Sequence, residues 1–365
     1  MITVTKTFLP PLEEYHKLLN GIWERGWLTN EGPLVERLEE VLKQELGVKH
    51  LFFVSNGTLA LQLAIKALAL KGDIITTPFS YVATTSSIVW EGCRPVFVDI
   101  CPETLCLDPA QIESAITPDT RAILATHVFG TPCDVEAIAR IASRHNLRVI
   151  YDAAHAFGVS HLGQSVLNSG DVSTLSFHAT KLFHTGEGGA VITTNDELAH
   201  RLSYMRNFGH NGPNQFIGLG INAKNSELHA AMGLSVLPYV PQLMQRRQAL
   251  SALYDALLTP LDLQRPMLPA GASSNYSYYP VLFRSEEQLL TAVAALNSHD
   301  IYPRRYFYPA LTNLPYTQGA AACPVAASVA SRVLCLPLYY ELAEAQVEQI
   351  AQIITEVCQR KGVCA

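Results

Sequence analysis

The chain has 365 residues, of which 48% are apolar and 16% are charged, and its formal net charge is -6. This length and composition allow a large buried core, which favours one large domain plus a smaller one. The negative charge and the lack of any Lys- and Arg-rich cluster exclude a general nucleic-acid-binding surface. No nucleic-acid partner is therefore expected.

The sequence carries no sign of export or of membrane insertion. Its first residues lack the long apolar segment of a secretory signal, and the longest apolar run, at 59–70, is interrupted by Gln62 and Lys66. That run is too short to cross a bilayer, so we expect a cytoplasmic protein without membrane contact. The eight cysteines show no C-x-x-C spacing and no nearby histidine, which predicts free thiols and no metal site.

Short apolar runs alternate with helical patterns between residues 50 and 195, which is typical of an α/β domain with a mostly parallel sheet. The runs predict strands at 51–54, 73–77, 95–99, 121–127, 148–152, 172–177 and 189–194. The patterns between them predict helices at 58–70, 81–90, 108–116 and 136–145.

The remainder of the chain predicts a smaller α+β domain. A long helical pattern at 225–253 is expected to break at Pro238 and Pro241. A strand at 276–283 and helices at 285–299 and 341–359 follow a stretch rich in Pro and Gly. We place the boundary near residue 240, which gives a large domain at 1–240, including an N-terminal arm, and a small domain at 241–365.

The first candidate site follows the strand predicted at 51–54, where a short turn containing Gly57 and Thr58 leads into an apolar helix. The first N–H groups of a helix have no partner within it and can bind a phosphate. Many such turns hold no ligand, and neither a Walker loop nor a dinucleotide fingerprint occurs here. Tyr81 begins the next helix, where its ring can stack on a planar cofactor or simply pack in the core.

A second candidate lies at the end of the strand predicted at 148–152, in the sequence Asp152-Ala-Ala-His155. A carboxylate at this end of a parallel strand faces the crevice where α/β proteins bind ligands. Asp152 can pair with a protonated ring nitrogen, but it can equally cap a helix or bind a metal. His155 is either part of the same site or a core histidine bonded to the backbone.

The most informative stretch is Ser176-Phe-His-Ala-Thr-Lys181, which follows an apolar strand and precedes a Gly-rich loop. An amine carried on a turn at a strand end, and desolvated there, can form a Schiff base. Pyridoxal 5′-phosphate (PLP) requires such a lysine, and it also requires a carboxylate for its protonated pyridine ring. Taken alone, Lys181 also fits an ordinary surface lysine.

In chain order, these residues resemble those of the DegT/DnrJ/EryC1/StrS sugar aminotransferases, which are fold-type I PLP enzymes. Further matching segments lie at 26–33, 95–99, 186–190, 206–209, 220–222 with Glu227, and 336–339. The likeness covers nearly the whole chain. It implies an α/β fold-type I PLP-dependent transferase, with a large domain built on a mostly parallel seven-stranded sheet and a smaller C-terminal α+β domain.

The resemblance also implies roles for the cofactor-binding residues. Lys181 would hold PLP as a Schiff base and later move a proton between cofactor and substrate, and Asp152 would pair with the pyridine nitrogen. The phosphate would be held by the amides of Gly57 and Thr58 and by the hydroxyls of Thr58 and Ser176.

Three further positions complete the implied cofactor site. Tyr81 would cover the cofactor ring. Asn222 matches an asparagine that reaches the phosphate from the neighbouring subunit, which implies a homodimer with shared active sites. His155 stands where many relatives have glutamine near the ring hydroxyl, so its partner there stays open.

The substrate side of the resemblance rests on two segments that border the nucleotide-sugar pocket in relatives. Trp27 and Thr29 belong to the first segment, and Arg304, Arg305 and Tyr306 belong to the second. A guanidinium matches phosphate geometry, so Arg304 or Arg305 is a candidate partner of the diphosphate. The alternative is that at least one of these arginines is solvated or lies at an interface.

The implied reaction has two halves. L-glutamate would leave its nitrogen on the cofactor as pyridoxamine 5′-phosphate (PMP), and a nucleotide-linked keto sugar would then accept it. The motifs most resemble those of family members that aminate C4 of dTDP-4-keto-6-deoxy-D-glucose, giving an amino sugar for polysaccharide such as lipopolysaccharide O-antigen. The alternatives are amination at C3 of a 3-keto isomer, a PLP-dependent sugar dehydratase (a lyase), whose branch has His in place of Lys181, and a non-catalytic regulatory PLP-binding protein.

Overall fold

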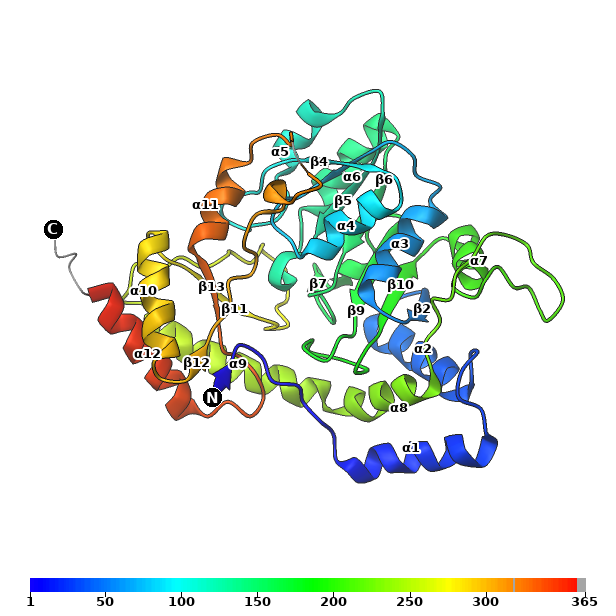
Figure 1. Cartoon of the computed structure of the whole chain (residues 1–365), viewed down its shortest axis with the longest axis horizontal. Coiled ribbons are helices and arrows are strands. Elements are labelled where there is room, and N and C mark those ends of the chain that lie inside the picture. The colour runs from blue at the N-terminus through cyan, green and yellow to red at the C-terminus, as the bar shows by residue number, and fades with distance from the viewer. Residues whose placement is uncertain (318, 360–365) are drawn as a thin grey trace.

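The computed structural model describes residues 1–317 and 319–359 (Figure 1). Seven of the eight cysteines lie in these ranges, and all seven are free thiols as expected. Cys364 lies outside the described residues. Within the described ranges, no helix combines the length and the apolar character needed to cross a membrane.

A seven-stranded sheet forms the centre of the molecule, and each of its strands matches one of the predicted strands. Its strands run in the order β2-β10-β9-β6-β5-β3-β4, and only β10 is antiparallel to its neighbours. The bounds are β2 His50–Val54, β3 Asp73–Thr76, β4 Arg94–Phe97, β5 Thr120–Thr126, β6 Arg148–Asp152, β9 Val172–Ser176 and β10 Gly189–Thr193. The mostly parallel sheet confirms the predicted α/β fold.

Helices cover both faces of this sheet (Figure 1). They are α2 Pro33–Leu46, α3 Gly57–Ala67, α4 Val82–Trp90, α5 Pro109–Ile112, α6 Val135–His145 and α7 Asp196–Met205, whereas α1 Leu12–Arg25 packs farther out, against the helix at Glu227–Val236. Successive strand residues point to opposite faces, so that Ile150 packs with α3 and α7 while Tyr151 packs on the side of α6. Burial on both faces explains why most of these strands contain runs of apolar residues instead of strictly alternating with polar ones.

The predicted long helix is interrupted once rather than twice. Helix α8, Glu227–Val236, and helix α9, Val240–Leu258, are separated by a single 3-10 turn at Leu237–Tyr239, which contains Pro238. The break predicted at Pro241 is wrong. Pro241 lies in the first turn of α9. The N–H groups of a first turn have no acceptor within the helix, so a proline there removes no helical hydrogen bond.

The C-terminal part builds a second core from β11 Tyr279–Leu282, β13 Val333–Leu336, α10 Glu286–Asn297 and α12 Glu344–Gln359, together with the second half of α9. Helix α11, Pro324–Arg332, instead packs its buried residues into the core that contains β3, β4 and β5. Strands β11 and β13 are antiparallel. The short β12, Ile301–Tyr302, pairs with β1, Ile2–Thr3, which is the start of the chain. The first residues therefore associate with the C-terminal part, whereas the sequence division at residue 240 assigns them to the large domain. A small hairpin, β7 Ser160–His161 and β8 Gln164–Ser165, completes the strands.

The start of α2 is tied to the start of α8 by one buried carboxylate. Glu227 is fully buried, and its Oε1 accepts hydrogen bonds from the N–H groups of Leu34 at 3.0 Å and Val35 at 2.9 Å. The guanidinium of Arg25 lies 3.5 Å from the same carboxylate. A negative charge at a helix N-terminus is stabilising, and here it also satisfies N–H groups that the helix leaves unpaired.

We expect Glu227→Ala to lower the free energy of unfolding by about 3 kcal/mol, because it leaves two buried N–H groups without an acceptor. Urea unfolding followed by fluorescence measures this loss. The control is Glu36→Ala, which removes an exposed acid from the same turn of α2 and should change stability by less than about 0.5 kcal/mol. Equal stability of the two variants would contradict the role of Glu227.

Candidate active site

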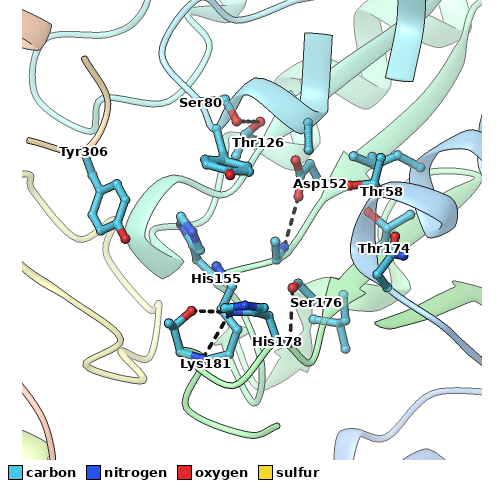
Figure 2. A pocket seen from close by; sticks show the side chains of 18 of the residues that line it. Thr58, Ser80, Thr126, Asp152, His155, Thr174, Ser176, His178, Lys181 and Tyr306 are labelled. Atoms are coloured by element: carbon cyan, nitrogen blue, oxygen red, sulfur yellow. Dashed lines mark hydrogen bonds between the residues drawn. The ribbon is translucent and has the colours of Figure 1, made fainter. Parts of the chain in front are cut away.

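One pocket lies at the edge of the sheet where the parallel strands end. Strands β5, β6 and β9 point their carboxyl ends at it, and helices α3 and α4 begin beside it. Asp152, His155, Ser176 and Lys181 face its interior (Figure 2). This is the edge at which open α/β sheets bind their ligands.

The turn between β2 and α3 forms a cradle for an anion. Gly57 is the first residue of α3, and the Asn56 side chain caps the helix by accepting from the N–H of Leu59. The backbone packs closely here, since a Cβ added at Gly189 would lie 2.8 Å from the Gly57 nitrogen. The free amides at the start of α3, together with the hydroxyls of Thr58 and Ser176, line the pocket as the sequence predicts.

Asp152 ends β6 and receives a directed chain of hydroxyl hydrogen bonds. The Thr84 hydroxyl donates to Asp152 Oδ2 at 2.7 Å, so Ser80 must donate to Thr84, and Thr126 donates to Ser80 at 3.1 Å. The N–H of Ala154 donates to Oδ1 at 3.2 Å. Burial raises the pKa of the Asp152 carboxyl, whereas these hydrogen bonds and the nearby Lys181 act in the opposite direction. All of the donors therefore favour the carboxylate form.

Lys181 follows β9, and its amine reaches the same pocket. Burial lowers the pKa of Lys181 to about 8, partly offset by the carboxylate of Asp152 and by Tyr81. An amine with such a pKa is substantially neutral at a slightly alkaline pH, which is the form that attacks a carbonyl carbon or accepts a proton. The Lys181 Nζ donates to the hydroxyl of Tyr278 at 3.4 Å.

His155 is buried between aromatic rings and faces the pocket with one edge. Its ring is nearly parallel to those of Phe129 and Phe307, and its Nδ1 accepts from the N–H of Phe129 at 3.3 Å. Burial lowers the pKa of His155, so the ring is neutral, and the accepting Nδ1 leaves the hydrogen on Nε2. His155 is thus a backbone-bonded core histidine that can still donate a hydrogen bond.

The two arginines of the substrate segment are placed differently. Arg304 lines the pocket, and its guanidinium lies 4.9 Å from the ring centre of Tyr306, which also lines it. Arg305 is not among the pocket residues, and its Nη2 donates to Glu286 at 2.6 Å and to the Ser331 carbonyl at 3.0 Å. The hypothesis that Arg305 meets the substrate is therefore corrected, because its guanidinium already has structural partners in the C-terminal part.

Three of the predicted residues lie on the surface of the chain, apart from the pocket. Trp27 and Asn222 are exposed, and the Trp27 indole donates to the carbonyl of Thr29. The side-chain oxygen of Asn222 accepts from Lys224 at 2.7 Å. The single chain therefore does not bring Trp27, Thr29 and Asn222 to the cofactor residues.

The structure adds pocket residues that sequence reasoning missed. They include Ser80, Thr126, Thr174, His178 and Tyr278, and Thr84 supports the site through Asp152. Two of these positions carried a signal, since Ser80 follows β3 and Thr126 ends β5, so both are polar residues at the carboxyl edge of the sheet. No sequence signal indicated Tyr278, because this residue lies in the C-terminal part of the chain, far from the strands that end at the pocket.

The donor set fits PLP group by group. The amides at the start of α3 match a phosphate, the carboxylate of Asp152 matches a protonated ring nitrogen, and the lysine amine matches an aldehyde. Tyr81 begins α4 with 55% of its surface exposed, so its ring is free to cover a planar ligand. No group in this set is left without a counterpart on the cofactor.

Comparison with known proteins agrees with this geometry. The family model described as the DegT/DnrJ/EryC1/StrS aminotransferase family matches residues 12–355. The chain belongs to this family. The DegT-family enzyme is thus a PLP-dependent sugar aminotransferase, as the resemblance in its sequence implied.

Individual relatives of this DegT-family chain cover almost its full length. A dTDP-4-amino-4,6-dideoxy-D-glucose transaminase of Shigella dysenteriae is 43% identical over 98% of this chain and 99% of its own. The crystal structure of DesI in the presence of its TDP-sugar product has a TM-score of 0.93 at 33% identity, covering 98% of this chain and 93% of the other. Ntda from Bacillus subtilis, solved with bound PMP, has a TM-score of 0.88 at 30% identity, covering 96% and 82%.

Proposed function

We propose that this enzyme transfers the amino group of L-glutamate to C4 of dTDP-4-keto-6-deoxy-D-glucose, giving dTDP-4-amino-4,6-dideoxy-D-glucose and 2-oxoglutarate. The observation that carries the proposal is the intact pair of Lys181 and Asp152 in one pocket, in a chain 43% identical to a transaminase named for that product. We further propose that the enzyme works in the cytoplasm, where nucleotide sugars are made.

The residues of the pocket divide the chemistry between them. Bound PLP supplies an electron sink for the carbon that loses and gains a proton. Lys181 Nζ would take the proton from that carbon and return it two atoms away, on the other side of the transferred nitrogen, and a pKa of about 8 suits it to both tasks. Asp152, fixed by Thr84 and the Ala154 amide, keeps the ring nitrogen protonated.

The remaining pocket residues hold the reactants in place. The start of α3, with Thr58 and Ser176, would hold the cofactor phosphate, and His155 Nε2–H would be available as a hydrogen-bond donor to the cofactor. Tyr306 borders the entrance, and Arg304 supplies a guanidinium there that matches an anion. The sugar diphosphate and the carboxylates of L-glutamate are the anions that Arg304 meets in turn.

We also propose that the enzyme is a homodimer and that Asn222 acts in the partner's site. The loop between α7 and α8 extends away from the body of the chain (Figure 1). It carries Asn222 and an exposed apolar group made up of Phe208, Phe216, Ile217, Leu219 and Ile221. Contiguous exposed apolar side chains of this kind favour a protein interface. A protein that is monomeric in analytical ultracentrifugation and fully active under the same conditions would contradict this proposal.

Incubation of the PLP-loaded enzyme with L-glutamate and dTDP-4-keto-6-deoxy-D-glucose tests the proposed reaction. We expect one equivalent of 2-oxoglutarate for each amino sugar, with nitrogen on C4 when the sugar is examined by mass spectrometry and NMR. Amination of only a 3-keto isomer would move the reaction to C3. If 2-oxoglutarate forms but neither keto sugar is aminated, L-glutamate remains the amino donor and both proposed acceptors are refuted.

A further inference from the structure

Four residues of the C-terminal part, Asn275 to Tyr278, form a strap beside the pocket just before β11, and Tyr278 lines the pocket. The last three of these residues were predicted as the start of a strand at 276–283, but β11 begins only at Tyr279. The polar groups of the strap form hydrogen bonds with other segments of the chain and not with a neighbouring strand. The Asn275 amide donates to the carbonyls of His155 at 2.8 Å and Phe157 at 2.9 Å, and the Ser277 hydroxyl donates to the carbonyl of His155 at 3.2 Å.

The other side of the strap is held by a buried arginine. Arg247 of α9 is 5% exposed, and its Nη1 donates to the carbonyls of Tyr276 at 3.3 Å and Ser277 at 3.1 Å. Burial lowers the pKa of Arg247 to about 10, although it remains a cation at neutral pH. A buried charge is costly unless it is hydrogen-bonded. Moving the strap would take these two carbonyl acceptors away from Arg247, so the arginine holds the strap in position.

The strap places Tyr278 against the catalytic lysine. The Tyr278 ring is 9% exposed, and its centre lies 4.8 Å from that of His155 and 5.5 Å from that of Tyr306. Its hydroxyl accepts from Lys181 Nζ at 3.4 Å, and within residues 1–317 and 319–359 the amine makes no other hydrogen bond. Because burial raises the pKa of Tyr278 above its ordinary value, the phenol keeps its own proton.

From this geometry, and resting on the proposed transamination, we propose that Tyr278 is a catalytic residue whose hydroxyl holds the Lys181 amine in position for proton transfer. The lysine is bound to the cofactor only between turnovers and must be retained in the pocket once it is released. A buried acceptor on a fixed strap limits the directions in which the amine can point. Asn275 and Arg247 are then positioning residues, which act through Tyr278.

The neighbouring tyrosine provides a matched control. Tyr279 is the next residue, and its side chain points into the core of the C-terminal part, where its hydroxyl donates to Asp255 at 2.7 Å. Tyr278→Phe and Tyr279→Phe therefore each remove one hydroxyl from adjacent positions, but only the first hydroxyl touches Lys181.

The first measurement is the single-turnover reaction of the PLP-loaded variants with L-glutamate. We expect Tyr278→Phe to lower the maximal rate about 10- to 100-fold and to leave half-saturation by L-glutamate nearly unchanged, because the lost contact is to the proton-transferring amine. Tyr279→Phe should keep the wild-type rate. A wild-type rate in Tyr278→Phe would overturn the proposal.

The second measurement does not depend on turnover. The full chain, freed of cofactor, is labelled with an amine reagent over a range of pH, and labelling of Lys181 is quantified by peptide mass spectrometry. An acceptor stabilises the ammonium form, so Tyr278→Phe should move the midpoint of Lys181 labelling to lower pH, whereas Tyr279→Phe should not. Equal midpoints in the two variants would overturn the proposal. If the wild type fails to react with L-glutamate, the proposed donor is wrong, and this labelling alone decides the role of Tyr278.

Discussion

Lys181→Ala is expected to abolish transamination completely, while the fold and the phosphate cradle persist. The variant removes the amine that bonds PLP and that moves the proton, so both half-reactions lose their acid and base. The purified protein should lack the visible absorbance of lysine-bound PLP and should form no 2-oxoglutarate. Spectra and a product assay on the same preparation measure the two losses together.

The control for this loss is Lys71→Ala, which removes an exposed lysine next to β3. It should retain the wild-type spectrum and rate. Turnover by Lys181→Ala above the background of the free cofactor would show that another group is the base and would remove Lys181 from the centre of the mechanism.

Asp152→Asn is expected to give the second-largest effect, a fall in maximal rate of at least about 100-fold. Asparagine has nearly the same shape but no charge, so it cannot keep the ring nitrogen protonated, and the cofactor loses much of its capacity as an electron sink. PLP should still bind, since the α3 cradle and Lys181 are intact. Stopped-flow measurement of the reaction with L-glutamate separates this loss of rate from a loss of cofactor.

A second buried carboxylate controls for the loss of charge. Asp99 is 5% exposed and accepts from the N–H groups of Val325 and Ala326 at the start of α11, both at 2.8 Å. Asp99→Asn should lower stability and leave the rate per folded, PLP-loaded molecule unchanged. Equal kinetic losses in the two variants would mean that Asp152 acts only through the stability of the fold.

The central sheet could be predicted because its strands are short, apolar and separated by helical patterns. Burial on both faces gave most strands a run of apolar residues instead of a strict alternation, and all seven predicted segments became strands of one sheet. The helix around Pro241 could not be predicted in the same way. Proline both breaks helices and begins them, and only the packing of α9 determines which effect operates.

The candidate site was predictable where its residues follow strands. Gly57, Asp152 and Ser176 lie at the end of, or directly after, β2, β6 and β9, and parallel strands bring these ends together. The strap could not be predicted, since Asn275 and Ser277 bond to carbonyl groups of residues 118 to 122 positions earlier in the chain. Arg305 was indistinguishable from Arg304 because its partner, Glu286, belongs to a helix whose position only the fold defines.

The pairing of β1 with β12 has a consequence for synthesis of the protein on the ribosome. Ile2 pairs with Ile301, so β1 cannot pair with β12 until about 300 further residues have been translated. At a typical bacterial or eukaryotic rate, that interval lasts roughly 15 to 60 s. The seven strands of the central sheet are complete by Thr193 and can assemble during this time. Strand β1 is therefore among the last strands to be paired, although it is synthesised long before its partner β12.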